Sequence, residues 1–135
     1  MANSNLLEEY KDISANLRHY SNMRFKQLTL FVALTGAIIT VLSGDNLLAT
    51  GAKISFKILG LLVAIIFWVM EERACDYWHR FVGRAVDIEK ELDFKQYTNR
   101  PTRRIFTATN AARLLYFLIL LFWLQTMLCP QFYFN

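Results

Sequence analysis

The sequence predicts an all-α membrane protein with three transmembrane helices, an amphipathic N-terminal helix and a long cytoplasmic extension of the second span. Hydrophobic residues make up 55% of the 135-residue chain. They are concentrated in three blocks, 28–42, 54–70 and 114–129, and each block approaches the ~20 residues of a membrane span once its flanks are counted. Charged segments with helical periodicity separate the blocks, which indicates helices outside the membrane as well.

A chain of this length is expected to form one membrane domain over residues 1–135. The expected elements are an amphipathic helix over 5–24, a first span over 25–43, a second span over 54–70 continuing as a cytoplasmic helix over 71–93, and a third span over 105–129. No signal peptide is expected, because a charged segment precedes the first apolar block and no small-residue cleavage site follows it.

The N-terminal segment has the apolar period of a helix that packs against another helix. Its apolar residues recur at intervals of four and three: Leu6, Tyr10, Ile13, Leu17 and Tyr20. The opposite face carries charges of both signs, whereas a helix lying flat on a lipid surface usually has a basic face. Packing against a partner helix is therefore favoured over the surface-lying alternative.

The first span carries small residues along one stripe: Thr29, Ala33, Gly36, Thr40 and Ser43. Small residues let helix backbones approach closely in lipid, so Gly36 and Thr40 are candidate helix-packing positions. A short loop over 44–53 with a turn signal then makes the first two spans an antiparallel hairpin.

The second span, in which Lys57 is the only charge, continues without a helix breaker into a second apolar seam. Its members recur at the same intervals: Ala74, Trp78, Phe81, Ala85, Ile88 and Leu92. Because the first two spans form a hairpin, this seam and that of 5–24 are expected to cover each other, with Trp78 and Phe81 as buried packing residues. Tyr77, Val82 and Val86 lie off the seam and would stay exposed on a monomer, which predicts a homo-oligomer with Val82 and Val86 at its interface.

The third span contains Arg113, an ionisable residue that needs a partner or a polar interface. An ion pair with Glu71 or Glu72 of the second helix is the favoured interpretation, with lipid contact or a transport role as alternatives. No acidic residue follows Asp93, which favours contact with anionic lipid headgroups for the basic residues beyond it: Lys95, Arg100, Arg103, Arg104 and Arg113. A binding site for a partner or a nucleotide is the alternative interpretation of these basic residues.

The distribution of basic residues predicts the orientation. Twelve Lys and Arg residues lie before the first span or between the second and third, against two near the loop joining the first two spans. The positive-inside rule therefore predicts a multi-pass protein of the cell (inner) membrane, with a cytoplasmic N-terminus and an external C-terminus. Cys75 and Cys129 would then lie on opposite sides of the membrane, so no disulfide is expected between them.

The sequence contains no complete catalytic constellation, and neither catalysis, a cofactor nor nucleic-acid binding is expected. Asp76, His79 and His19 are candidate metal ligands, because Asp-x-x-His resembles in spacing the ligand pairs of carboxylate metal bundles. Solvation of the helix is the favoured interpretation of these three residues, so no metal is expected.

The expected function is structural: a small polytopic membrane protein that forms a homo-oligomeric scaffold. An oligomeric pore or a membrane effector is the first alternative, with a polar stripe available at Thr29, Thr35, Thr40 and Ser43. A metal-binding membrane protein is the second alternative.

The run Glu-Glu-Arg-Ala-Cys-Asp-Tyr-Trp-His-Arg over 71–80, with Gly-Arg-Ala over 83–85 and Ile-Glu-Lys-Glu-Leu over 88–92, resembles small bacterial membrane proteins of unknown function. In arrangement the chain is similar, over roughly residues 5–100, to RipA-type oligomeric membrane proteins and to SLATT-type effectors associated with nucleotide-triggered defence. The resemblance implies a homo-oligomer, with pore formation as one form of it, and no catalytic residue.

Overall fold

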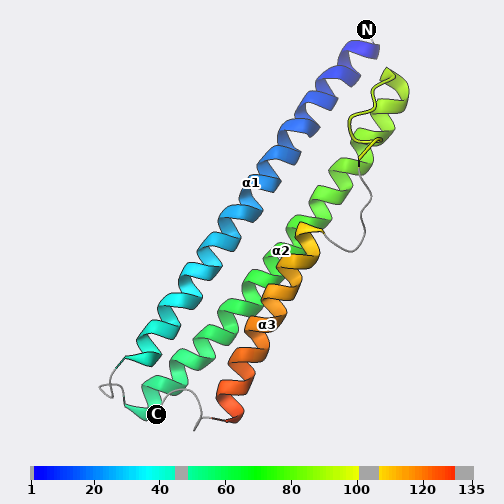
Figure 1. Ribbon diagram of the computed structural model, residues 1–135. Helices are drawn as coiled ribbons and strands as arrows, with labels where there is room; N and C mark the ends of the chain where they lie inside the picture. The colour runs from blue at the N-terminus through cyan, green and yellow to red at the C-terminus, as the bar shows by residue number, and fades with distance from the viewer. Residues whose placement is uncertain (1, 45–48, 101–106, 130–135) are drawn as a thin grey trace.

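A computed structural model describes residues 2–44, 49–100 and 107–129 and contains three helices (Figure 1). They are α1 (Ala2–Ser43), α2 (Thr50–Leu92) and α3 (Ala108–Leu128). No strand occurs in the described ranges. Each helix is long and apolar enough to cross a membrane, which confirms the predicted all-α class with three spans.

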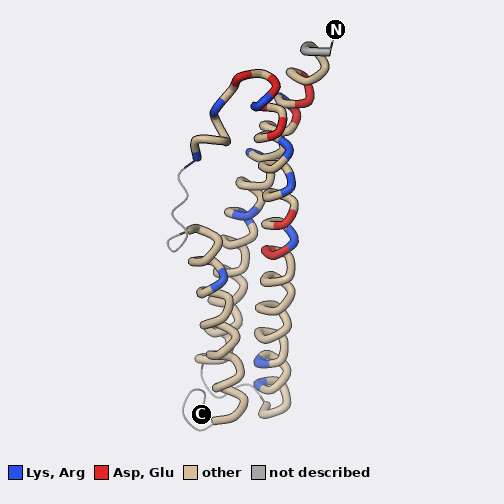
Figure 2. The backbone as a smooth tube through the Cα atoms, turned by 90° about the vertical axis from the view of Figure 1, so that its right-hand side faces the viewer, with Lys and Arg blue, Asp and Glu red and all other residues tan. Residues whose placement is uncertain are grey.

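α1 and α2 form a long antiparallel hairpin, and α3 packs beside α2 in the half of the hairpin nearer the connection between α1 and α2 (Figure 1). The segments 5–24 and 25–43, expected as two elements, form one continuous α1. No Gly or Pro occurs between residues 2 and 35 to interrupt the backbone. Most charges lie in the half of the hairpin away from that connection (Figure 2). We call this half, residues 4–24 of α1 and 71–92 of α2, the stalk.

The apolar half has a core shared by all three helices. It consists of Phe31, Ile38, Leu42, Ala64, Phe67, Tyr116 and Trp123. Large apolar side chains such as Leu30, Leu62 and Leu118 nevertheless remain exposed outside this core. A surface of this kind is unfavourable in water and matches the hydrocarbon of a bilayer, so the chain is a multi-pass membrane protein.

The two apolar seams of the stalk meet and form a second core. Its buried members are Tyr10, Ile13, Leu17, Ala85 and Ile88. Trp78 and Phe81, expected at the centre of this interface, are only half-buried and pack at its side. An exposed ion pair also joins the two helices, with Arg84 Nε 2.7 Å from Glu9 Oε1.

The end of α2 is closed by a buried carboxylate. Asp93 follows the helix with a left-handed φ of 55°, and the chain then turns back over Glu89. The Glu89 carboxylate accepts hydrogen bonds from the Tyr10 hydroxyl (2.8 Å), the Tyr97 amide (2.8 Å), the Thr98 amide (2.9 Å) and the Thr98 hydroxyl (2.7 Å). Although burial opposes ionisation, these donors lower the pKa of Glu89 to about 2. The same contact and burial raise the pKa of the Tyr10 hydroxyl well above its usual value.

Candidate functional site

A cleft lies where the stalk meets the spans. It has a volume of about 540 Å³ and is formed by α1, α2, the start of α3 and Arg100 of the connector. Its lining residues are Ser21, Arg24, Phe25, Leu28, Glu71, Trp78, His79, Arg100, Thr107, Ala108, Thr109, Asn110, Ala112 and Arg113. We call it the junction cleft.

A buried ion pair between α1 and α2 forms the inner wall of the junction cleft. Arg24 Nε donates to Glu71 Oε1 over 2.9 Å, and the Nη2 group of Arg24 contacts the same oxygen. Arg24 Nη2 also donates to Thr109 Oγ1 of α3 over 3.1 Å. Glu71 is only 2% exposed, so removing Arg24 would leave a buried charge without its partner.

A second ion pair connects α2 and α3. Arg113 Nε donates to Glu72 Oε1 over 2.7 Å, and the Trp68 indole donates to the same carboxylate over 3.1 Å. Arg113 therefore pairs with Glu72, one of the two partners considered from the sequence, whereas Glu71 pairs with Arg24 instead. Two adjacent carboxylates on α2 thus join it to two different helices.

The outer part of the junction cleft carries an arginine, an indole and an imidazole. The Arg100 guanidinium lies over the Trp78 ring, 4.2 Å from its centroid, a cation–π contact. His79 Nδ1 lies 2.7 Å from the Cys75 carbonyl oxygen, and the acceptor assigns the proton to Nδ1. No carboxylate in the described part of the chain pairs with Arg100.

The start of α3 forms one edge of the junction cleft. Thr107 is the N-cap, and its hydroxyl accepts a hydrogen bond from the Asn110 amide over 3.1 Å. The first turn of α3 contains no acidic residue. The partial positive charge of this helix end therefore adds to that of the neighbouring arginines.

The three candidate metal ligands do not meet. His19, Asp76 and His79 are all exposed. His19 lies in a groove with Tyr20 and Tyr77, whereas His79 lines the junction cleft. No group of three or more His, Cys, Asp or Glu side chains arranged to hold a metal occurs among the described residues.

The two cysteines are both free. Cys75 is buried beside Glu71, with its sulfur 3.5 Å from Glu71 Oε1, and burial raises the pKa of its thiol. The Cys75 thiol therefore stays protonated near neutral pH, which makes it a poor nucleophile.

The residues expected at an oligomer interface fall into two groups. Gly36 and Thr40 are exposed, and a Cβ added at Gly36 would meet nothing within 4 Å. Val82 and Val86, expected to be exposed, are half-buried, and Val82 packs against the stalk core. The rotation of α2 turns Val82 toward α1, and Tyr77, at 41% exposure, is the apolar residue left outside. Tyr77 stacks on Tyr20 with ring centroids 5.7 Å apart.

The four polar residues considered as the lining of a pore do not share one face of α1. Thr35 is buried, whereas Thr29, Thr40 and Ser43 are exposed. The Thr29 and Thr40 hydroxyls donate to carbonyl oxygens of their own helix, at 3.0 and 2.9 Å.

Lys57 forms a polar contact that its sequence position did not reveal. Its side chain is buried, and Nζ donates to the Thr126 carbonyl oxygen near the end of α3 over 3.0 Å. The sequence shows an isolated charge in an apolar block, but a backbone acceptor on a distant helix leaves no residue pattern. Arg103 and Arg104 lie outside the described residues.

Comparison with protein-family models, with curated proteins and with solved structures gives no match to this chain.

Proposed function

We propose that this chain is a non-catalytic membrane protein that assembles through its spans into a homo-oligomeric scaffold. The observation that carries this proposal is the small-residue stripe of α1, which the chain leaves uncovered. Its five members are all exposed: Thr29, Ala33, Gly36, Thr40 and Ser43.

The stripe lies across α1 from the face that contacts α2. The buried residues of the α1 span are Phe31, Thr35, Ile38 and Leu42. At 100° per residue, these and the stripe lie on nearly opposite sides of the helix. A Cβ added at Gly36 would meet nothing within 4 Å, so the fold of the single chain does not itself require glycine there.

A second copy is the partner that this surface fits best. Small residues let two helices approach closely in lipid, where packing rather than hydrophobic burial drives association. The satisfied hydroxyls of Thr29 and Thr40 present no unpaired donor to a neighbouring helix. Pairing through α1 also joins equivalent surfaces, as a two-fold symmetric interface requires.

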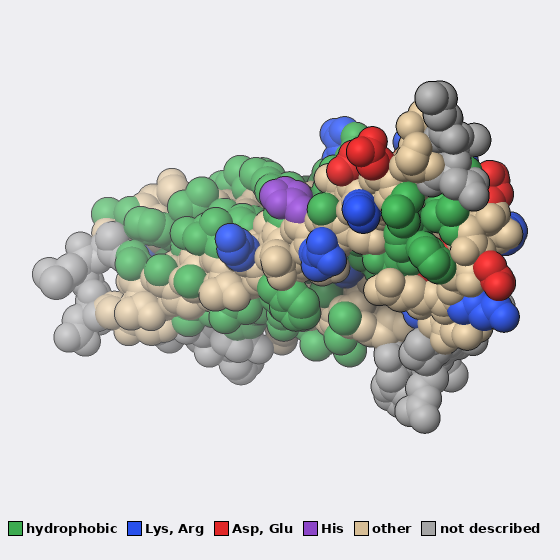
Figure 3. Space-filling view, turned by 90° about the horizontal axis from the view of Figure 1, so that it is seen from above, with side chains coloured by type: hydrophobic (Ala, Val, Ile, Leu, Met, Phe, Trp, Pro, Cys, Tyr) green, Lys and Arg blue, Asp and Glu red, His purple; other side chains and the backbone are tan. Residues whose placement is uncertain are grey.

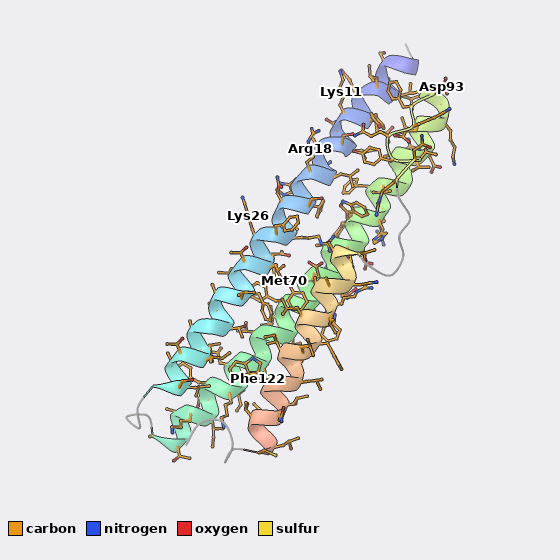
Figure 4. The ribbon with its side chains drawn as sticks, viewed as in Figure 1. Lys11, Arg18, Lys26, Met70, Asp93 and Phe122 are labelled. Carbon is orange, nitrogen blue, oxygen red and sulfur yellow. The ribbon has the colours of Figure 1, made fainter. Side chains whose placement is uncertain are left out.

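The charges of the stalk limit this interface to the membrane. Lys11, Arg18 and Lys26 lie on the outer side of α1, away from α2 (Figure 4), and all three are exposed. Two parallel α1 helices packed along their whole length would bring these like charges together, so the proposed contact ends where the apolar segment ends.

The separation of the polar groups supports a non-catalytic role. His19, Asp76 and His79 are spread over different grooves, and the Cys75 thiol is held protonated. The uneven distribution of Lys and Arg supports the inner membrane with the stalk in the cytoplasm as the place where the scaffold acts.

The test is the mass of the purified protein in a mild detergent, measured by light scattering over a range of concentrations. We expect an oligomer for the wild type and a shift to monomer for Gly36→Leu, because the larger side chain separates the two backbones. Ala37→Leu is the matched control, since Ala37 is exposed on the same helix but lies off the stripe.

A wild type that stays monomeric at all concentrations, or an equal effect of both substitutions, would contradict the proposal. The same samples reconstituted into liposomes separate a scaffold from a pore. Steady ion flux with the wild type that is lost with Gly36→Leu would assign the assembly to a pore.

A further inference from the structure

We propose that the junction cleft binds the phosphate of an anionic phospholipid headgroup. This site is independent of the proposed oligomer interface, because it lies between the three helices and not on the outer face of α1.

The charge of the junction cleft is positive. Three arginines line it, Arg24, Arg100 and Arg113, against Glu71 as the only carboxylate among its lining residues. Arg24 and Arg113 are paired with Glu71 and Glu72, whereas Arg100 rests on Trp78 without a carboxylate partner in the described ranges. An arriving anion would therefore gain an ion pair with Arg100 without having to break an existing one.

The donors already present suit phosphate oxygens. The Arg100 guanidinium offers a planar set of N–H groups that matches a phosphate. The first turn of α3, Ala108 to Asn110, lines the same cleft, and the partial positive charge of a helix start favours anions. The Asn110 amide itself is engaged with the Thr107 hydroxyl. His79 is not one of these donors, because its Nδ1 proton is engaged with the Cys75 carbonyl and the neutral ring presents only the lone pair of Nε2 to the cleft.

The position of the junction cleft favours a lipid over an anion in solution. Its lining includes the apolar residues Phe25, Leu28 and Ala112, near the ends of two spans, and Phe25 is 66% exposed. Figure 3, a view of one outer face of the molecule, shows positively charged side chains where the more hydrophobic half gives way to the charged half. A headgroup bound there would leave its acyl chains beside the exposed apolar surface of the spans.

The length of the elements places the junction cleft at headgroup depth. The predicted first span begins at residue 25 and the second ends at residue 70, and Arg24 and Glu71 lie directly outside them. A membrane-embedded molecule is therefore always supplied to this position at high local concentration, whereas free phosphate must arrive from the cytoplasm.

The experiment measures binding to the full-length protein in detergent by native mass spectrometry, with three probes: a short-chain phosphatidylglycerol, the matching phosphatidylcholine, and inorganic phosphate. We expect the phosphatidylglycerol to bind at least tenfold more tightly than either other probe. Arg100→Gln should weaken this binding about fivefold, the effect of one basic residue near an anionic headgroup.

Arg80→Gln is the matched control, because Arg80 is an exposed arginine of the stalk that does not line the junction cleft. It should leave the affinity for phosphatidylglycerol unchanged. Circular dichroism checks that both variants keep the helical content of the wild type, which is expected because neither arginine forms an ion pair in the described residues.

Three results would overturn the proposal. Equal binding of phosphatidylglycerol and phosphatidylcholine would mean that the headgroup charge is not recognised. Equal weakening by Arg80→Gln and Arg100→Gln would indicate attraction to the whole stalk rather than a site. Inorganic phosphate binding as tightly as the lipid would replace the lipid by a soluble anion.

Discussion

Glu89 is a buried carboxylate that stays charged because the chain folds donors around it. Its side chain is 1% exposed and accepts hydrogen bonds from α1 and from the connector after α2. Hydrogen bonds to an ionised group are stronger than neutral ones, and an unsatisfied buried carboxylate would be costly. Glu89 therefore joins three segments of the stalk end at one point.

Glu89→Gln should destabilise the stalk by about 2–3 kcal/mol, because one neutral amide oxygen replaces two charged acceptors and the new NH₂ group faces a backbone N–H that cannot accept. Glu91→Gln is the control, since Glu91 lies two residues further along α2 and is exposed. Hydrogen exchange of the Tyr97 and Thr98 amides is the measurement, and equal exchange in both variants would contradict the role given to Glu89.

The same residue predicts a pH dependence. The pKa of Glu89 is lowered from 4.5 to about 2 in the folded protein, so the unfolded chain binds the proton first as the pH falls. The stability contributed by Glu89 is therefore complete above about pH 4.5 and is lost progressively toward pH 2. Amide protection of Tyr97 and Thr98 should fall across this window in the wild type and change less in Glu89→Gln.

At the scale of the elements, α3 is fixed to the hairpin by close packing around Trp123 and by polar contacts near both of its ends. A Cβ on Gly60 would lie 2.4 Å from the Trp123 ring, so only glycine allows the present separation of α2 and α3. The Lys57 contact with Thr126 lies at one end, and the Arg113 pair with Glu72 lies at the other.

Gly60→Ala should therefore weaken the docking of α3 by about 1–3 kcal/mol, the usual cost of overpacking a tight contact. Gly83→Ala is the matched control, because Gly83 also lies inside α2 and a Cβ there would meet nothing within 4 Å. Gly83→Ala should be neutral or stabilising by up to about 1 kcal/mol. Thermal unfolding in one detergent compares them, and the reverse order of stabilities would show that Trp123 tolerates the added methyl group.

The arrangement of the elements was predictable where the signal repeats along the chain. Matching intervals in 5–24 and 71–92 predicted two seams that meet, and Ile13 and Ile88 are buried between them. Single contacts were not predictable in this way. Glu71 and Glu72 differ by 100° around one helix, and only the rotation of α2 decides which faces Arg24 and which faces Arg113.

For the same reason, only part of the candidate site could be predicted from the sequence. The sequence marked Arg113, Glu71 and Glu72 as charges at a membrane boundary, but it did not reveal that Arg100 and Trp78 would line the same cleft. Arg100 follows α2 by several residues, and its contact depends on how the connector turns back after Asp93.

At the scale of the whole molecule, the positions of the start of α1 and the end of α3 fit a chain that crosses the membrane an odd number of times. The start of α1 and the end of α3 lie at opposite ends of the molecule (Figure 1), and the basic residues are concentrated on the side of the stalk (Figure 2). Enzyme reporters inserted at Asn46 and fused after Asn135 should therefore both report the exterior, whereas a fusion before Met1 should report the cytoplasm. An Asn135 fusion active in the cytoplasm would mean that α3 does not cross.

The length of the stalk has a consequence for whatever meets its free end. At 1.5 Å per residue, the part of α2 over 71–92 extends about 33 Å beyond the apolar segment. An anionic membrane surface is screened over about 8 Å at physiological salt. With the spans in such a membrane, the junction cleft would lie inside that layer, while the turn around Glu89 would stand roughly four screening lengths away from it. One hairpin would thus present two ends to different electrostatic environments: a base among the lipid headgroups and a tip that another protein would meet as an ordinary aqueous surface.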